Sequence, residues 1–584
     1  MELSEQQKAI KYAPLSPLSV IACAGSGKTT TAVQRLSEIR KLLNKERGYI
    51  ALLSFSNVAV DTFRRDFLLH SSKESNKHTY SDRVTIETLD SFIVGNVIRP
   101  HGARVMGCSK MPFLITGKEQ FLRNGKFNFF INKKDGTTTR IGAEKLGDLT
   151  CRVVRKKVEC FLQSNSIVNG LELIRSLGEI GAYTHEFGGY WACKILKEQA
   201  HLANILAKRY PHIVVDEAQD IGSMHAYFLT MLAKAGSSIS LIGDPNQAIY
   251  EFAGADGSFL KSHNKQDTTI SYPLTVNRRS IKDIVDASSS ISGFVNQHVR
   301  DKQSADSGLF YCTYKENDYR EVINIFTNRA KELKIAMGNT AILVRGKSLK
   351  HSLSGGSIST GQGNTRLLVL ACIKRDLEGD PFEAFKLTLS CLSGLIEDSP
   401  KDFLSSVINS TKSMRNYYET KKIIWRFVRT AMNGLPSAYL HAKKEWHPQL
   451  KGNISRVLDE ICKLNGFNTV ERLGNKLSAA KLPDTPLGIL SVEDGNEDKL
   501  SIRIDTVHQS KGESLDAVMY IASNSQIKKM IEGTDTEEGR IGYVALTRAR
   551  DMFVLAIPEN SKIQFSEKLD DIGFVFLNTV NDSV

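Results

Sequence analysis

Residues 22–29 read Ala-Cys-Ala-Gly-Ser-Gly-Lys-Thr, directly after an apolar run (residues 18–21) and at the start of a helical pattern. This is the strand–loop–helix context of a phosphate-binding loop. Glycines let backbone N–H groups curl round phosphates, Lys28 can reach the β and γ oxygens, and Thr29 can ligate Mg²⁺. The stretch predicts that a run of neighbouring residues holds the triphosphate of a nucleotide: Ala22, Cys23, Ala24, Gly25, Ser26, Gly27, Lys28, Thr29 and Thr30.

A second motif, Val-Asp-Glu-Ala-Gln-Asp at residues 215–220, also follows a strand of the buried type. Asp216 is placed to hold the Mg²⁺, and Glu217 is placed to orient or deprotonate an attacking water. Adjacent carboxylates at a strand end complement a phosphate-binding loop. The two motifs together predict an NTPase with Lys28, Asp216 and Glu217 in its catalytic site.

Length and charge point to several domains and a polyanionic partner. At 584 residues the chain is too long for one hydrophobic core, and its length suggests about three to four domains. Lys and Arg total 77 against 64 for Asp and Glu, and the net charge of +13 favours a polyanion such as DNA.

The cysteines and the N-terminal residues bear on the cellular location of the protein. The nine cysteines are scattered and none forms a Cys-x-x-Cys pair, which predicts reduced thiols and argues against a zinc or iron–sulfur site. Residues 1–11 are polar and lack the apolar core of a signal peptide. No apolar run approaches the ~20 residues of a membrane span. We therefore expect a cytoplasmic protein without a membrane partner.

Short apolar strands alternate with helical patterns in two sets. The first set comprises residues 18–21, 49–55, 84–89, 213–215 and 238–242. The second set comprises residues 309–312, 340–344, 502–504, 517–521 and 552–557. Such alternation is typical of parallel sheets whose ligand loops lie at the carboxyl ends of the strands. We therefore expect an α/β fold with two parallel sheets.

A long insertion interrupts each set, and both insertions read as mainly helical, for example over residues 383–395 and 417–433. The exception is a hairpin turn at residues 132–136, Asn-Lys-Lys-Asp-Gly. Basic and aromatic residues interleave within residues 123–134 and 412–429. Each stretch fits either a nucleic-acid surface or a helix with buried aromatics and solvated lysines.

Residues 243–255 read Gly-Asp-Pro-Asn-Gln-Ala-Ile-Tyr-Glu-Phe-Ala-Gly-Ala, which closely parallels GDxxQSIYxWRGA. Other segments parallel LxxNYRS (residues 274–280), TLHSAKG (506–512) and EERRLxYVxxTRA (537–549). Over nearly its whole length the chain resembles the UvrD/Rep/PcrA-like helicases of superfamily I. The resemblance implies two RecA-like P-loop NTPase domains, each carrying a mostly helical insertion. The implied boundaries are 1–92 and 196–272 for domain 1A, 93–195 for insertion 1B, 273–360 and 498–584 for domain 2A, and 361–497 for insertion 2B.

The resemblance assigns three residues to the nucleoside of ATP. Gln7, in the Leu-Ser-Glu-Gln-Gln segment at residues 3–7, is implied to contact the adenine edge. Arg35 takes the position that packs against the base. Glu513 is implied to contact the ribose, although it is displaced by one residue from the family's position.

Three further residues are assigned to the phosphates. Gln247 is implied to sense the γ-phosphate, and Arg279 takes the place of an arginine that reaches it. Arg548 is the candidate arginine finger, donated from the second sheet to nucleotide held by the first. Catalysis then requires the cleft between the sheets to close, because a finger is worth ~10³–10⁵ in rate.

The resemblance also implies contacts to single-stranded DNA. Bases stack on aromatic side chains at ~1–3 kcal/mol each without sequence preference. The implied contact residues are Phe55 and Asn57 of Ser-Phe-Ser-Asn, Phe92 of Thr-Leu-Asp-Ser-Phe, Tyr250, Phe252 and His508. Three positions depart from the family's pattern: Asp90 replaces a histidine, Ala253 an arginine, and Arg278 the adenine-stacking tyrosine.

The function implied is that of an ATP-dependent DNA translocase or helicase. It would travel 3′→5′ on single-stranded or tailed duplex DNA and hydrolyse ATP to ADP and phosphate. The alternative is an ATP- and DNA-sensing regulatory subunit that gates a partner nuclease and unwinds little. The chain also resembles the UvrD-like subunit of Gabija anti-phage systems, including Val-Ile-Arg-Pro at residues 97–100. An RNA helicase or a small-molecule kinase fits less well, since a kinase needs neither Gln247 nor Arg279.

Overall fold

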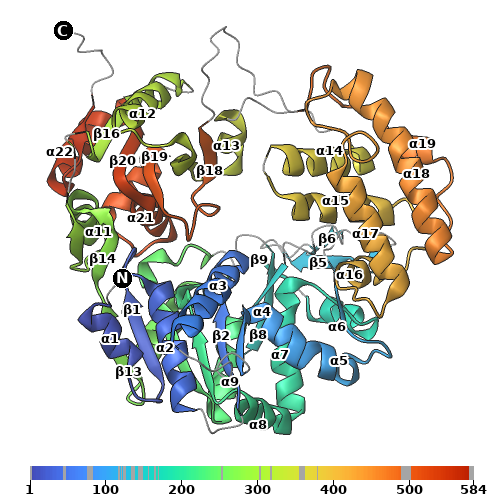
Figure 1. The fold of residues 1–584 in the computed structure, drawn as a ribbon, viewed down its shortest axis with the longest axis horizontal. Coiled ribbons are helices and arrows are strands. Elements are labelled where there is room, and N and C mark those ends of the chain that lie inside the picture. The colour runs from blue at the N-terminus through green and yellow to red at the C-terminus, as the bar shows by residue number, and fades with distance from the viewer. Residues whose placement is uncertain are drawn as a thin grey trace.

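The computed structural model describes the chain in segments. These are residues 3–43, 48–74, 83–115, 119, 121–122, 127–132, 138–142, 146, 149–154, 157–162, 166–168, 170–251, 254–301, 304, 306–315, 318–353, 362–377, 379–487 and 502–577. In Figure 1 the two parallel sheets lie on the left, one below the other, and the two insertions lie on the right. Within these segments no helix is both long and apolar enough to cross a membrane.

The first sheet has six parallel strands in the order β13–β1–β12–β11–β2–β3. The strands are β13 (Ile270–Leu274), β1 (Leu18–Ala22), β12 (Ser238–Gly243), β11 (His212–Val215), β2 (Ile50–Ser54) and β3 (Val84–Thr88). All are predicted from the sequence except β13. Because the strands are parallel, the loops after β1, β11 and β12 meet at one edge of the sheet.

Alternate residues of these strands point to opposite faces, and a separate core covers each face. Val214 points to the face covered by α2 (Lys28–Leu42) and α3 (Asn57–Glu74), where Leu36 and Phe63 are fully buried. Ile213 and Val215 point to the other face. The helices there are α7 (His185–Glu198), α8 (Ala200–Arg209), α9 (Ser223–Lys234) and α10 (Ser258–Asn264). We call this sheet with its helices the first lobe.

The second sheet also has six parallel strands, in the order β18–β17–β19–β20–β16–β21. They are β18 (Arg503–Thr506), β17 (Thr340–Val344), β19 (Leu515–Ile521), β20 (Ala549–Pro558), β16 (Gly308–Tyr314) and β21 (Val575–Phe576). Only the two-residue edge strand β21 is absent from the sequence prediction. The observed architecture is therefore the predicted one, an α/β fold built on two parallel sheets.

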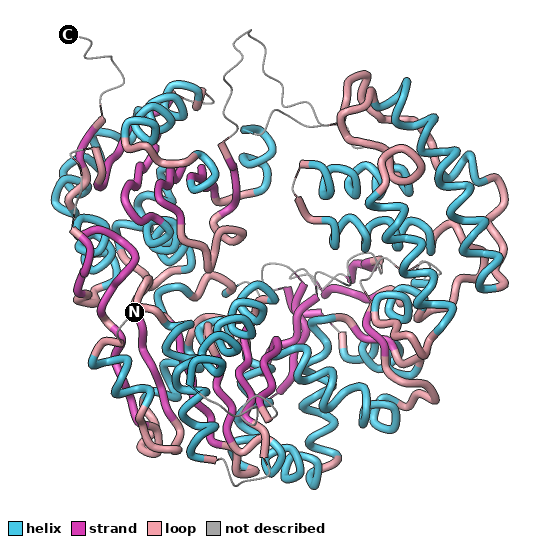
Figure 2. Tube along the Cα trace, in the orientation of Figure 1, coloured by secondary structure: helices cyan, strands magenta, loops and turns pink. Residues whose placement is uncertain are grey.

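Helices cover both faces of the second sheet, as Figure 2 shows in cyan. One face carries α11 (Lys282–Ser292), α20 (Asn524–Glu532), α21 (Glu537–Arg548) and α22 (Lys562–Ile572). The other carries α12 (Arg320–Glu332), with α13 (Lys347–Leu353) nearby. A two-stranded parallel pair, β14 (Val276–Ile281) and β15 (Gln297–Arg300), joins the two sheets. We call the second sheet, with its helices and the β14–β15 pair, the second lobe.

Insertion 1B contains, beside its helices, a sheet of which the sequence predicted only one hairpin. Its centre is a five-stranded antiparallel sheet in the order β6–β5–β9–β8–β7. The strands are β5 (Phe129–Asn132), β6 (Thr138–Ile141), β7 (Leu149–Val154), β8 (Lys157–Leu162) and β9 (Ser166–Val168). The β5–β6 pairing confirms the predicted hairpin, whose turn lies largely outside the described residues. The other strands alternate apolar and polar residues too briefly to stand out in the sequence.

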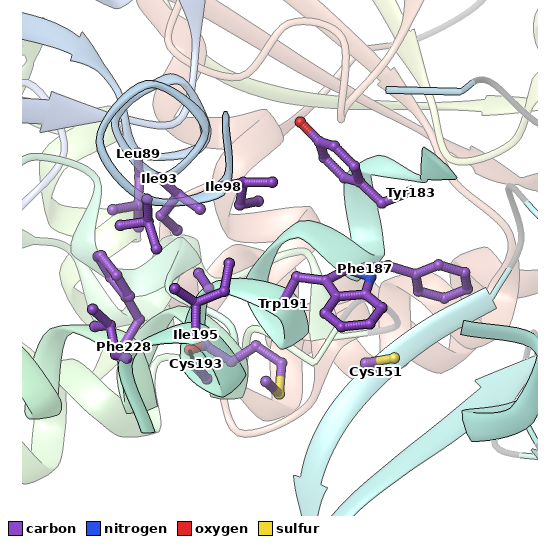
Figure 3. Packing of buried hydrophobic residues seen from close by; sticks show 14 of the residues in the cluster. Leu89, Ile93, Ile98, Cys151, Tyr183, Phe187, Trp191, Cys193, Ile195 and Phe228 are labelled. Carbon is purple, nitrogen blue, oxygen red and sulfur yellow. Dashed lines mark hydrogen bonds between the residues drawn. The ribbon is translucent and has the colours of Figure 1, made fainter. Parts of the chain in front are cut away.

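The helices of insertion 1B share one core with the first lobe. They are a π-helical turn (Val94–Ile98), which continues α4 (Leu89–Ile93) of the first lobe, and the helices α5 (Arg99–Met106) and α6 (Leu171–Glu179), beside a short pair, β4 (Phe113–Leu114) and β10 (Ala182–Tyr183). Figure 3 shows Ile98, Phe187, Trp191 and Phe228 as members of this core. The core crosses the implied boundaries at residues 92 and 195, so those boundaries remain a proposal.

Insertion 2B is helical, as predicted, and has a core of its own. Its helices are α14 (Gly363–Asp376), α15 (Pro381–Ser393), α16 (Phe403–Ile408), α17 (Arg415–Arg429), α18 (His447–Asn465) and α19 (Leu473–Lys476). Trp425 of α17 stacks against Phe385 and Phe382 of α15, with ring centroids 4.7 and 6.3 Å away. Aromatic packing between helices therefore accounts for part of the basic–aromatic pattern in this segment.

Candidate nucleotide site and DNA track

The phosphate-binding loop joins β1 to α2, as the sequence predicts. Gly25 and Gly27 have φ angles of 69° and 81°, in the left-handed region that glycine adopts without strain. A Cβ on Gly25 would lie 2.6 Å from the Cβ of Arg279, so Arg279 packs directly on the phosphate-binding loop. The side chain of Lys28 is buried, and its Nζ lies 3.4 Å from the carbonyl oxygen of Cys23.

The two carboxylates of the acidic motif lie at the end of β11. Glu217 has a φ of 53°, a strained conformation for a non-glycine residue and one that often marks a functional site. The side chain of Gln219 donates to Glu217 Oε2 at 2.6 Å. Burial opposes ionisation of Glu217, but Lys28 and Lys511 outweigh it and lower the pKa of that carboxyl.

Asp216 fits the role of a Mg²⁺ ligand. It is 1% exposed, and its Oδ1 has no hydrogen-bond partner among the described residues. Burial and the neighbouring Glu217 raise the pKa of Asp216 to about 8. An orphaned, buried carboxylate oxygen beside a phosphate-binding loop suits a hard divalent cation. Thr29, in the first turn of α2, supplies the predicted hydroxyl.

The structure brings together the residues of both lobes that are predicted to contact the γ-phosphate. Gln247 Nε2 donates to Asp244 Oδ2 at 2.8 Å, and Gln247 Oε1 accepts from Arg548 Nη2 at 3.0 Å. Arg279 Nη1 donates to the carbonyl oxygen of Thr547 at 2.8 Å. Burial and the neighbouring Arg548 lower the pKa of Arg279 to about 9. The predicted sensor and the predicted finger therefore touch across the cleft.

Helix α21 contacts the segment 244–251 of the first lobe at several points besides Arg548. Arg540 donates to the carbonyl oxygen of Ala248 and to Glu251 Oε2, each at 2.6 Å. The hydroxyl of Tyr543 lies 3.5 Å from Asp244 Oδ2. Helix α21 of the second lobe therefore contacts residues from both ends and the middle of segment 244–251.

A buried ion pair between the lobes is absent from the sequence prediction. Lys511 Nζ donates to both carboxylate oxygens of Asp220, at 2.6 and 2.7 Å, and to the carbonyl oxygen of Gln247 at 2.8 Å. The two side chains are 8% and 7% exposed. Both residues belong to motifs that the sequence reveals, at residues 506–512 and 215–220. The available signal was that each motif contains a charged residue without an assigned role.

The residues assigned to the nucleoside have mixed surroundings. Gln7 caps α1 (Glu5–Lys11) with Ser4, and its Nε2 donates to the carbonyl oxygen of Ser26 in the phosphate-binding loop at 3.4 Å. Arg35 is buried, and its guanidinium donates to backbone carbonyl oxygens at residues 11, 13 and 14. Glu513 forms a two-pronged ion pair with Arg503 at 2.8 and 2.9 Å. Arg35 and Glu513 are therefore already engaged with the protein.

A cavity of about 330 Å³ lies between the acidic motif and the predicted DNA contacts. Phe55 and Tyr250 line it together with Glu217, Asp220 and Lys511. The ammonium of Lys511 lies 4.7 Å from the centre of the Tyr250 ring. We use the term DNA track for the predicted DNA contacts and this cavity.

Four of the predicted DNA contacts are at least partly exposed, namely Tyr250, Phe55, Asn57 and His508. The ring of Phe55 is half-buried and lies 5.9 Å from that of His225, while Asn57 is exposed. His508 Nε2 lies 3.0 Å from the carbonyl oxygen of Ile249, and its ring is 5.7 Å from that of Tyr250.

Phe92 corrects a prediction, and Phe252 is not placed. The side chain of Phe92 is 0% exposed and packs edge-on against Tyr210 and Phe228 at 4.8 and 6.4 Å. It is therefore a core residue in this conformation and does not present a face for stacking DNA bases. The Thr-Leu-Asp-Ser-Phe segment at residues 88–92 does not indicate which way the ring of Phe92 points. Phe252 and Ala253 lie outside the described residues.

Asp90, which departs from the family's histidine, belongs to a cluster of imidazoles. His225 Nε2 lies 3.0 Å from Asp90 Oδ1, and His185 Nδ1 lies 3.5 Å from Asp90 Oδ2. Burial raises the pKa of Asp90, but the hydrogen bond to His225 and the charges of both histidines outweigh it and lower the pKa. The track therefore carries a carboxylate where the family has a base.

Comparisons with known proteins agree with this geometry. Residues 3–163 and 183–268 match the UvrD/REP helicase N-terminal domain, and residues 409–560 match the UvrD-like helicase C-terminal domain. The chain is 26% identical to the ATP-dependent DNA helicase HMI1, mitochondrial, of Saccharomyces cerevisiae, over 50% of this chain and 40% of that protein. It is 22% identical to the putative ATP-dependent DNA helicase YjcD of Bacillus subtilis, over 96% of this chain and 79% of that one.

A further relative is named as part of an assembly. The chain is 24% identical to RecBCD enzyme subunit RecB of Chlamydia pneumoniae, over 62% of this chain and 37% of that protein. The matched region spans less than half of HMI1 and of RecB.

Proposed function

Since the chain belongs to the UvrD-like helicases of superfamily I, as a divergent member, we propose that it hydrolyses ATP to ADP and phosphate and moves along single-stranded DNA. The observation that carries this proposal is the contact between Gln247 and Arg548 at 3.0 Å, which joins the two lobes at the phosphate-binding loop. A pocket completed by both lobes couples hydrolysis to their relative movement.

Each lobe supplies a defined part of the chemistry. Lys28 holds the β and γ oxygens, and Glu217, fixed by Gln219, orients the attacking water. Arg279 and Arg548 stabilise the charge that develops on the transferred phosphoryl group. Thr29 and Asp216 would hold Mg²⁺, which neutralises phosphate charge when bound.

The buried pair of Lys511 and Asp220 supports coupling between this chemistry and DNA. Lys511 contacts Asp220 of the acidic motif on one side and the ring of Tyr250 on the other. A base that displaces Tyr250 therefore disturbs a cation that also lowers the pKa of Glu217. Tyr250, Lys511 and Glu217 thus connect the DNA track to the site of hydrolysis.

The direct test measures ATP turnover with and without single-stranded DNA, then strand displacement on 3′-tailed and 5′-tailed duplexes. We expect stimulation by DNA and displacement of the 3′-tailed duplex only. Affinity for DNA should fall steeply with salt, because backbone phosphates dominate binding. Lys28→Ala is the inactive control. Absence of stimulation in the wild-type chain, or an affinity independent of salt, contradicts the proposal.

A second candidate is a regulatory subunit that senses ATP and DNA and gates a partner nuclease of the phage-defence type. The altered track favours it, because Asp90 puts a carboxylate where DNA passes and Phe92 is buried. The likeness to a RecBCD subunit is consistent with action in a hetero-oligomer. Stimulation of ATP turnover without any strand displacement supports this candidate over the first. Either function would be carried out in the cytoplasm.

A further inference from the structure

Two buried thiols face each other across adjacent strands of insertion 1B. Cys151 of β7 and Cys160 of β8 are direct partners in the antiparallel pairing, and their sulfur atoms are 3.5 Å apart. Directly opposed residues have Cα atoms about 4.5–5.5 Å apart, within the range that a disulfide spans. The sulfur atoms need to approach by roughly 1.5 Å to reach bonding distance.

The surroundings of Cys160 favour its thiolate, which is the reactive form. The thiol of Cys151 lowers the pKa of Cys160 by hydrogen bonding to it, against burial, and the backbone N–H of Gly170 lowers it further. Gly170 caps the N-terminus of α6. A Cβ at this position would lie 2.8 Å from the sulfur of Cys160, so glycine lets the helix end approach the sulfur.

Cys151 connects this pair to the DNA track. It lines the 330 Å³ cavity that Glu217 and Asp220 also line, so a small oxidant in that cavity reaches it. Figure 3 shows Cys151 near Phe187 and Trp191 of α7, with which it shares a core. Two residues further along β7, the N–H of Val153 donates to Ser223 Oγ at 3.0 Å. Ser223 is the first residue of α9, three positions after Asp220.

We propose that Cys151 and Cys160 form a reversible oxidation site for peroxides, and that the resulting disulfide lowers DNA-stimulated ATP turnover. One thiolate attacks a peroxide oxygen, the O–O bond breaks, and the sulfur becomes a sulfenic acid while the other oxygen leaves as hydroxide and takes up a proton to give water. The second thiol attacks that sulfur, the S–S bond forms, and a second water departs. Two thiols and one hydrogen peroxide thus give one disulfide and two waters. The effect on turnover rests on the proposed ATPase function, whereas formation of the bridge does not.

The experiment treats the reduced full-length chain with hydrogen peroxide and maps its peptides without reduction. We expect a peptide pair joined through Cys151 and Cys160, a loss of two hydrogens from the intact mass, and reversal by dithiothreitol. Cys151→Ser and Cys160→Ser should each abolish the pair. Cys193→Ser is the matched control, because Cys193 is equally buried on α7 and donates only to the carbonyl oxygen of Met224 in the described structure.

Turnover is measured on the same samples. Oxidation should lower DNA-stimulated turnover by about fivefold in wild type and in Cys193→Ser, and leave Cys151→Ser unaffected. Oxidation confined to other thiols, such as the less buried Cys108, overturns the site. A bridge that forms without changing stimulated turnover overturns its coupling to the track. If the reduced chain shows no stimulation at all, the proposed ATPase function fails, and the peptide map still decides whether the bridge exists.

Discussion

The nucleotide site and the DNA track are built from neighbouring segments of the same two lobes, but they differ in how far each residue is fixed by its neighbours. In the nucleotide site, Asp216 and Arg548 are each 1% exposed, and Gln247 is 3% exposed and hydrogen-bonded to both lobes. In the track, Asn57 is exposed and the side chain of Asp90 is 31% exposed. Buried polar groups must be partnered, so substitution in the first region disturbs several residues at once. Substitution in the second should disturb fewer neighbours, and Asp90 is a position there at which the chain departs from its family.

Removing the finger should give the largest effect. We expect Arg548→Ala to keep ATP binding and to lower turnover by about 10³-fold or more, because the cation that completes the pocket is lost. Nucleotide affinity and steady-state turnover measure the two properties separately. Arg550→Ala is the control, since Arg550 pairs with Asp516 at 3.1 Å and should keep turnover near that of wild type. A normal rate for Arg548→Ala would falsify the composite pocket.

Breaking the buried pair between the two regions should be the next largest effect. Lys511→Met leaves Asp220 without its cation, and we expect a loss of about 3 kcal/mol in the free energy of unfolding together with loss of DNA stimulation. Denaturant unfolding and turnover with DNA measure these. The double variant Asp220→Asn with Lys511→Met should recover stability without recovering stimulation. Recovery of both would remove the coupling role of the pair.

Substitution of two phenylalanines distinguishes a core residue, Phe92, from a predicted DNA contact, Phe55. Phe92→Ala should destabilise the fold by about 3 kcal/mol, because Phe92 is fully buried. Phe55→Ala should cost about 1–2 kcal/mol of single-stranded DNA affinity and less stability, because its ring is half-buried. Thermal unfolding and a DNA-binding titration give the pair of values for each variant. Specific loss of DNA affinity in a stably folded Phe92→Ala protein would return Phe92 to the track.

The smallest effect is expected at Asp90. Asp90→Asn removes one negative charge beside two histidines, and DNA affinity at low salt should rise roughly twofold, in line with about 0.5 kcal/mol for a partly exposed charge. The gain should disappear at high salt, where such charges are screened. Asp286→Asn on α11 removes an exposed charge from an ion pair with Lys282 and is the matched control. Equal changes in both variants would mean that only net charge matters.

The sequence predicted the parts of this molecule whose signal is local. Most strands of the two parallel sheets are short apolar runs, and only β13 and β21 were not predicted; β21 is two residues long. The sheet of insertion 1B escaped because its strands are amphipathic and short, for example Leu149–Val154. The burial of Phe92 and the ion pair of Lys511 with Asp220 were not predicted, for another reason. The direction of a side chain and its partner in a distant segment are set by tertiary packing, which no local pattern encodes.

The grip of α21 on residues 244–251 has a consequence for how the lobes separate. Arg540, Tyr543 and Arg548 project from one rigid helix, and each contacts a different residue of that segment. A rod held at three points does not slip past its partner by one contact at a time, so the lobes part by breaking all three together. We therefore expect opening to be an all-or-none event between two discrete positions, and any movement that it drives to have a fixed length rather than a graded one.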